Sequence, residues 1–248
     1  EDFVKDLSQW YIRRGRVRFK NGDANALGTL HYVLLELSKL LAPFVPFISE
    51  VMYLNLSGEK ESVHLENYFD SKKENIDEDV LKKMNLAREI CSNGLKVRED
   101  AKMNLRQPLL EAYISIDDSE IMEIVKEELN VKSIFYAKEQ PKGECIKSFG
   151  NSEKLVSINT MLSDDLKEEG MLNDFLRKYR DIRKKQGLKI NDTVSLVLFT
   201  ESELLKEVVD GCGKTTLQVK DIQFVDDISK TENQFKVGNV QVGLTINL

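Results

Sequence analysis

One change in the spacing of apolar residues, close to Asn104, constrains the fold of this chain more than any other feature. Before this point, apolar side chains recur every three to four residues, as they do on one face of a helix. After it, short stretches alternate apolar and polar residues, which is the period of a strand. Because only helical periodicity precedes this point and strand-like segments appear after it, we predict two domains, residues 1–104 and residues 105–248.

The first domain is predicted to be an all-α helical bundle. Pro46 suits the first turn of a helix, and Asp77 is a good N-cap residue. In the helix that begins at Pro46, we expect Phe47, Val51 and Leu54 to face the core, since they share one side. Amphipathic helices joined by short and medium links are typical of a bundle. The four segments with the helical period are residues 2–20, 24–41, 46–56 and 77–101.

The second domain is predicted to be a smaller α+β domain. Strands at residues 109–116 and 131–137 enclose a helix at 117–129, which makes a compact β-α-β unit. A long helix is expected to start after Ser163 and to stop at Gly187. The fold class that follows is a multidomain chain, with an all-α helical bundle followed by a smaller α+β C-terminal domain.

The overall charge limits the classes of partner. The chain has 36 Lys and Arg residues against 42 Asp and Glu residues, for a net charge of -6. This balance excludes a protein that is basic over its whole surface, but it leaves room for a local basic face that binds nucleic acid. The apolar stretches are far shorter than a membrane span, so we expect no membrane association.

The cysteines and the first residue bear on the origin of the chain. Cys91, Cys145 and Cys212 form no CxxC pair and no disulfide framework, which indicates a reducing compartment and hence a cytoplasmic protein. No secretory signal opens the chain. Because the chain begins at Glu1 and not at methionine, we expect a piece of a longer protein.

The residues do not assemble a recognisable catalytic centre. His31 and His64 have no cysteine or second histidine at metal-ligand spacing, so a structural role is the better interpretation for both. No P-loop and no GxSxG elbow occurs. We therefore predict no catalytic residue, no metal site and no cofactor site within this chain.

Two clusters of positive charge stand out against the acidic average, and the first follows an aromatic pair. Guanidinium groups bind phosphates and flat rings stack on bases, which favours contact with a folded RNA. The alternative is a solvated helix face whose arginines pair with acids elsewhere. The residues of this first cluster, which we predict to contact RNA, are Trp10, Arg13, Arg14, Arg16, Arg18 and Lys20.

The second cluster lies at the end of the long helix, where only Asp181 offsets it. A cationic C-terminus complements the helix dipole, but that role needs only a few of these charges. The excess favours a polyanionic partner. The predicted contact residues in this cluster are Arg177, Arg180, Arg183, Lys184 and Lys185.

Several segments resemble the isoleucyl-tRNA synthetases, which are class I aminoacyl-tRNA synthetases. Trp10-Tyr11, paired arginines and a final Arg-x-Arg-Phe at residues 16–19 resemble the helix that opens their anticodon-binding domain. Residues 41–50 (LAPFVPFISE) and 105–109 (LRQPL) are similar to later landmarks of the same region. Residues 168–170 and 182–192 resemble the C-terminal region of the archaeal/eukaryotic-like branch. Gly15 and Lys20 depart from the usual motif, which has a serine and an aromatic residue at these positions.

The resemblance implies a function. It implies a fragment of isoleucine–tRNA ligase that holds the anticodon stem and loop of tRNA(Ile), while the complete enzyme charges that tRNA with isoleucine using ATP and Mg²⁺. The HxGH-like and KMSKS-like signatures of class I catalysis are absent from the chain. The fragment alone is therefore expected to be inactive, and we expect it to be a monomer.

Two other functions remain open at this point. One alternative is a helical-bundle protein-interaction module, whose arginines dock on acidic partners. The other is a stand-alone RNA-binding paralogue with no role in aminoacylation.

Overall fold

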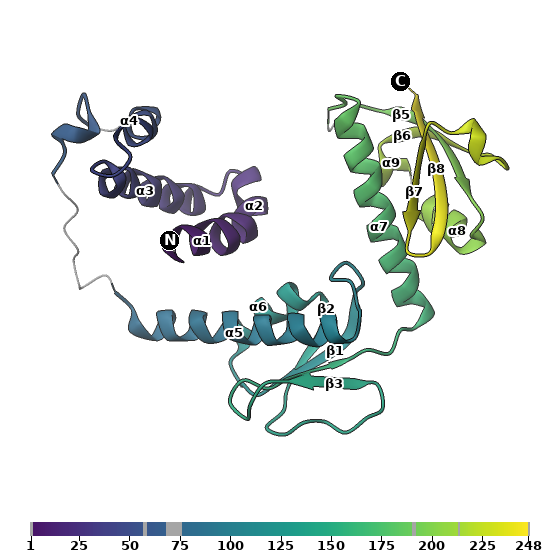
Figure 1. Cartoon of the computed structure of the whole chain (residues 1–248), viewed down its shortest axis with the longest axis horizontal. Helices are drawn as coiled ribbons and strands as arrows, with labels where there is room; N and C mark the ends of the chain where they lie inside the picture. Colours follow the sequence, from purple (N-terminus) through teal and green to yellow (C-terminus); the bar gives the residue numbers. More distant parts are fainter. Residues whose placement is uncertain (1, 57–58, 68–75, 190–191, 213, 248) are drawn as a thin grey trace. The chain divides into compact units, whose positions relative to one another are not determined.

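The computed structural model describes residues 2–56, 59–67, 76–189, 192–212 and 214–247. The chain forms two compact units, residues 1–76 and residues 77–248 (Figure 1). The division lies 28 residues before the boundary at 104/105 that the change of period predicts. Each unit is described by itself.

The first unit is helical. A continuous helical stretch opens the chain, and its middle part has the wider π-helical spacing. Asp23 then caps the next helix by accepting bonds from the backbone N–H groups of Asn25 and Ala26, and Pro46 opens the following one. The elements of this unit are α1 (Asp2–Asp6), the π-helix η1 (Leu7–Ile12), α2 (Arg13–Lys20), α3 (Ala24–Leu41), α4 (Pro46–Asn55) and the 3-10 helix η2 (Val63–Leu65).

The side of α4 that is buried differs from the predicted side. Tyr53 is fully buried, and its hydroxyl donates to the Glu66 carboxylate and accepts from the backbone N–H of Lys60. Phe47, which was expected in the core, is 87% exposed, and Val51 and Leu54 are exposed with it. The prediction of the inward face of this helix is therefore wrong for the described residues. A stripe of apolar residues marks one side of a helix but does not state which side the rest of the protein covers.

The second unit opens with a long helix that lies on a sheet. α5 packs against α6 and against strands β3 and β4. The sheet order is β2-β1-β4-β3, in which β1 and β2 are parallel and the other neighbours are antiparallel. The elements are α5 (Glu78–Asp100), β1 (Leu109–Ile114), α6 (Ser119–Leu129), β2 (Val131–Tyr136), β3 (Ile146–Phe149) and β4 (Val156–Asn159).

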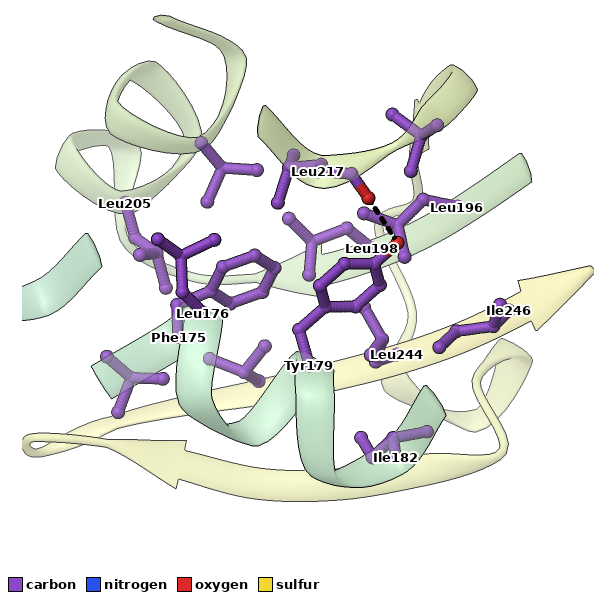
Figure 2. Close-up of a cluster of buried hydrophobic side chains, with 14 of the residues drawn as sticks. Phe175, Leu176, Tyr179, Ile182, Leu196, Leu198, Leu205, Leu217, Leu244 and Ile246 are labelled. Atoms are coloured by element: carbon purple, nitrogen blue, oxygen red, sulfur yellow. Dashed lines mark hydrogen bonds between the residues drawn. The ribbon is translucent and has the colours of Figure 1, made fainter. Parts of the chain in front are cut away.

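The remainder of the unit repeats this arrangement. A second sheet has the order β6-β5-β8-β7, again with one parallel pair and two antiparallel pairs. The helix α7 packs on it together with α8, and their buried side chains form the largest apolar core described (Figure 2). The elements are α7 (Asp164–Lys185), β5 (Val194–Thr200), α8 (Glu203–Gly211), α9 (Lys214–Leu217), β6 (Val219–Phe224), the 3-10 helix η4 (Ile228–Lys230), β7 (Asn233–Val237) and β8 (Val240–Asn247).

The correspondence between the two halves of this unit extends to single residues. Both leading helices are followed by a residue with positive φ, at Lys102 (55°) and Gly187 (74°). Leu109 N–H donates to the carbonyl of Asn130, and Val194 N–H donates to the carbonyl of Gln218. Asn130 and Gln218 also share positive φ values of 49° and 56°. Residues 78–159 and 164–247 are therefore two copies of one α-β-α-β-β-β arrangement, which we call the first and second repeats.

These observations correct the predicted fold class. The predicted β-α-β unit over residues 109–137 is present, but the prediction of a large all-α bundle followed by a smaller α+β domain is wrong. The segment assigned to the fourth bundle helix is α5, which covers a sheet, and residues 77–248 contain two mixed four-stranded sheets. The helical period identifies an amphipathic helix, but a sheet and a helix bury its apolar stripe equally well.

Candidate nucleic-acid interface

The first basic cluster lies on α2, directly after the π-helical segment. Trp10 lies inside that segment and is half-buried. Arg14 is half-buried, whereas Arg13, Arg16 and Arg18 are exposed. Because π-helical spacing differs from 3.6 residues per turn, the segment shifts Trp10 relative to the residues that follow it. On a regular helix, Trp10, Arg14 and Arg18 would form one straight strip along the same side. Here Trp10 and Arg14 are half-buried, so this strip is not the most exposed side of the helix.

An aromatic contact explains the glycine in this helix. A Cβ atom at Gly15 would lie 2.7 Å from Cζ of Phe19, so the missing side chain gives the Phe19 ring its place. The Phe19 ring in turn lies 5.9 Å from the ring of Tyr11, whose hydroxyl donates to the carbonyl of Ala26 at 3.1 Å. Through Tyr11, these contacts join Phe19 of α2 and the preceding π-helical segment to α3.

Arg18 is held by an ion pair. Its Nε atom lies 2.8 Å from Oδ2 of Asp23, the residue that caps α3. The hydrogen bond to Arg18 holds the pKa of Asp23 below its ordinary value, and the same bond raises the pKa of Arg18. Arg18 is thus fixed in position, but part of its charge is balanced within the protein.

Arg16 and Lys20 are the most available cations of this helix. They are exposed and lie one turn apart. Within the described residues, neither has an ion-pair partner. Arg13, by contrast, donates from Nε to the carbonyl of Gln9 at 2.7 Å. Arg16 and Lys20 are therefore the best placed residues of the cluster to meet a phosphate.

The second basic cluster is the outer face of the last turns of α7. Ser163 caps this helix, acidic residues occupy its first turn and basic residues its last, which suits the helix dipole. Its inner face carries Phe175, Leu176 and Tyr179, which point into the core of the second repeat (Figure 2). The candidate cations on its exposed face are Arg177, Arg180, Lys184 and Lys185, and of these Arg177 lies 3.9 Å from Asp181.

Arg183 differs from the other members of this cluster. It is only 6% exposed, and its guanidinium donates to the hydroxyl of Tyr179 and to the backbone carbonyls of Lys189 and Asp192. The Tyr179 hydroxyl in turn donates a hydrogen bond to the backbone carbonyl of Leu217 at 2.7 Å (Figure 2). Arg183 therefore joins the end of α7 to the loop that follows it. Its place on the inner side, four residues after Tyr179, is the sequence signal that could have separated it from its neighbours.

The two clusters belong to different units. Trp10 and the cations of α2 lie in residues 1–76, and the cations of α7 lie in residues 77–248. Along α7, acidic residues occupy the first turn and basic residues the last, with Asp181 the acid within the basic cluster. A groove of about 450 Å³ beside α8 is lined by Asp165, Glu168 and Glu207, near the opposite end of the helix. Along this helix, a polyanion is therefore favoured at the C-terminal end over the acidic N-terminal end.

Other kinds of site are not found in the described part of the chain. No group of three or more His, Cys, Asp or Glu residues there is arranged to hold a metal ion. None of the described helices is both long and apolar enough to cross a bilayer.

Parts of the chain match known proteins. The family described as "Anticodon-binding domain of tRNA ligase" matches residues 1–114, which include the helical unit, α5 and β1. Isoleucine–tRNA ligase of Chlamydia trachomatis serovar A is 42% identical over 154 residues, 56% of this chain. That of Dehalococcoides mccartyi is 35% identical over 217 residues, 79% of this chain. The chain is homologous to a region of isoleucine–tRNA ligase.

The region is a minor part of each relative. The match covers 15% of the Chlamydia trachomatis isoleucine–tRNA ligase and 21% of the Dehalococcoides mccartyi enzyme. The isoleucine–tRNA ligase of Deinococcus radiodurans is 27% identical over 285 residues, with 83% of this chain and 26% of that enzyme aligned. The relatives named here are all bacterial.

Proposed function

We propose that this chain is the tRNA-binding part of an isoleucine–tRNA ligase and that it holds the anticodon stem and loop of tRNA(Ile). The observation that carries the proposal is the agreement between the anticodon-binding match over residues 1–114 and the exposed cations of α2 within it. Phosphate contacts supply affinity and register, which is the contribution expected of a part that positions a large RNA.

The proposed contacts follow the exposed side chains. On α2 they are Arg16 and Lys20, with Arg13 beside them, and Arg14 and Arg18 are supporting residues because they are half-buried and ion-paired respectively. Trp10 remains a proposed stacking residue. On α7 the proposed contacts are Arg177, Arg180, Lys184 and Lys185. We leave Arg183 out of the contact set because its guanidinium is bound inside the fold.

The proposal assigns the chemistry to the rest of the enzyme. ATP, Mg²⁺ and isoleucine would bind a catalytic part that carries the class I signatures, and this chain alone would form no aminoacyl-adenylate. We further propose a cytoplasmic, monomeric protein. The similarity of residues 168–170 and 182–192 supports the archaeal/eukaryotic-like branch, although the relatives named above are bacterial.

Filter binding of purified chain to tRNA at two salt concentrations tests the proposal. We expect affinity to fall steeply as salt rises, because counterions released from phosphates drive such binding. Competition with bulk tRNA, followed by identification of the bound species, would show whether tRNA(Ile) is preferred. Equal affinity at both salt concentrations, or no binding, would contradict the proposal and favour a protein-interaction module.

A second measurement separates the fragment from a complete enzyme. We expect ATP–pyrophosphate exchange with isoleucine to stay at background. Exchange above background with pure chain would contradict the assignment of catalysis to another part of the protein.

A further inference from the structure

The sheet of the first repeat has one covered face and one open face. α5 and α6 lie on the covered face, where Ala112, Ile114 and Ile158 are fully buried (Figure 1). Successive side chains of a strand point to opposite faces. Tyr113, between Ala112 and Ile114 on β1, therefore points to the face that carries no helix of this repeat.

An aromatic pair lies on that open face. Tyr113 on β1 is paired with Phe135 on β2, and their ring centroids are 5.6 Å apart with an angle of 33° between the planes. Phe135 lies on the edge strand β2 and is 45% exposed. Phe135, and the half-buried Tyr113 beside it, present apolar ring surface to solvent.

Two polar side chains, those of Glu111 and Asn159, lie beside the rings. Glu111, two residues before Tyr113 on the same face, accepts from the side-chain amide of Asn159 at 2.9 Å. Burial and a side-chain hydrogen bond to Glu111 hold the pKa of Tyr113 above its ordinary value. A carboxylate at this position repels a phosphate but accepts bonds from the amino and imino groups of a base.

The second repeat shows that the fold does not need these rings. Tyr113 is flanked by Phe135 and Ser157, and the residue in the same place of the second sheet, Val197, is flanked by Gln223 and Thr245. The same strand connections thus form with a valine and a glutamine at the two positions. The exposed rings of the first repeat are therefore not required by the architecture.

We propose that Tyr113 and Phe135 form a stacking platform for an unstacked base of the bound RNA. The proposal rests on the tRNA-binding function proposed above. The match to the anticodon-binding domain ends at residue 114, so the strand that carries Tyr113 is the last element of the matched region. Aromatic rings on an open sheet face bind bases by stacking, and Glu111 and Asn159 face the edge of a base held there.

The second repeat provides the substitutions that test this proposal. The double variant Tyr113→Val with Phe135→Gln takes the residues that the second repeat uses, and its affinity for tRNA is measured by filter binding over a range of salt concentrations. We expect binding weaker by about ten-fold or more, since stacking of a single base contributes substantially to affinity. The slope of affinity against salt should not change, because no phosphate contact is removed.

Two controls guard this result. Phe199→Ser removes a ring from the same kind of face in the second repeat, and its tRNA affinity should equal that of the unaltered chain. Phe135→Leu keeps an apolar contact with Tyr113 and removes only the ring, so it should fold even if the double variant does not, and it should bind about three-fold or more weakly.

The platform is disproved if the folded double variant, or Phe135→Leu, binds tRNA as tightly as the unaltered chain. Equal weakening by Phe199→Ser would also overturn it, since the loss would then not be specific to this pair. Absence of tRNA binding by the unaltered chain would instead contradict the proposed function, so the two failures are distinguishable.

Discussion

Arg98 and Arg183 occupy the same place in the two repeats. Each lies near the end of a leading helix, and each guanidinium donates to backbone carbonyls six and nine residues later: Asn104 and Gln107 in one case, Lys189 and Asp192 in the other. Arg98 also donates to the carbonyl of Leu129 at 2.9 Å. Both side chains replace the regular hydrogen bonds that the loop before the first strand does not make.

Replacing Arg98 with methionine should destabilise the second unit. Arg98 is 2% exposed, and burial lowers its pKa to about 10. Methionine fills part of the space, but the carbonyls of Leu129, Asn104 and Gln107 lose their donor. We expect a loss of about 3 kcal/mol in the free energy of unfolding, measured by urea denaturation with circular dichroism. Lys178→Met, on an exposed face, is the control and should change stability by less than about 0.5 kcal/mol. A loss of the same small size for Arg98→Met would contradict the structural role.

Replacing Lys102 with glycine should stabilise the protein. Lys102 has a φ of 55°, in the left-handed region, where a side chain is strained, and the second repeat has Gly187 at this place. Glycine removes the strain but adds freedom to the unfolded chain, so we expect a gain of about 0.5–1 kcal/mol. Thermal unfolding would measure it. The reciprocal variant Gly187→Lys should lose stability, and a gain there would refute this explanation.

Acid should weaken the first unit through Glu66. The hydrogen bond from Tyr53 holds the pKa of Glu66 below its ordinary value in the folded state. A carboxyl with a depressed pKa contributes stability that is present above its unfolded pKa and is lost as pH falls through the folded pKa. The free energy of unfolding followed by fluorescence of Trp10, the single tryptophan, should therefore decline in acid.

Glu66→Gln isolates this effect. The amide still accepts a hydrogen bond but does not titrate, so the acid-dependent part of the decline should shrink. Glu61→Gln, at an exposed position, is the matched control and should keep it. A decline of unchanged size in Glu66→Gln would assign the acid sensitivity to other groups.

Charge reversal on α2 should reduce both tRNA affinity and its salt dependence. With Arg16→Glu and Lys20→Glu together, the slope of log affinity against log salt should become shallower by about 2, close to one unit for each phosphate contact removed. Lys5→Glu reverses an exposed charge on α1 and should change the slope less. If Lys5→Glu changes the slope as much per substitution as the Arg16→Glu and Lys20→Glu double variant does, net charge and not this helix face determines tRNA binding.

At the end of α7, exposed and buried cations of one cluster should affect different properties, tRNA binding and stability. Arg180→Gln with Lys184→Gln removes exposed cations and should weaken tRNA binding with little change in the midpoint of thermal unfolding. Arg183→Met should lower that midpoint, because the carbonyls of Lys189 and Asp192 lose their donor. Titration with tRNA and calorimetry measure the two effects. A destabilised Arg180 variant paired with a stable Arg183 variant would reverse our assignment of their roles.

The sequence was sufficient for elements whose signals are local. The cap at Asp77, proline at the start of α4, the cap at Ser163 and the β-α-β unit after residue 109 each depend on a few neighbouring residues, and all are present. The motifs that resemble isoleucyl-tRNA synthetases also lie in short segments. The family matches agree with that resemblance at the level of the region.

Only the tertiary structure decided what each amphipathic face covers. The period of α5 is the same whether its apolar side meets a helix or a sheet, and the long-range contacts with β3 and β4 select the sheet. The same limit applies to charge: Arg180 and Arg183 lie three residues apart in one basic run, yet one is exposed and the other is buried against backbone carbonyls. A sequence fixes the chemistry and the local period of its residues, while the environment of each side chain depends on segments that meet only after folding.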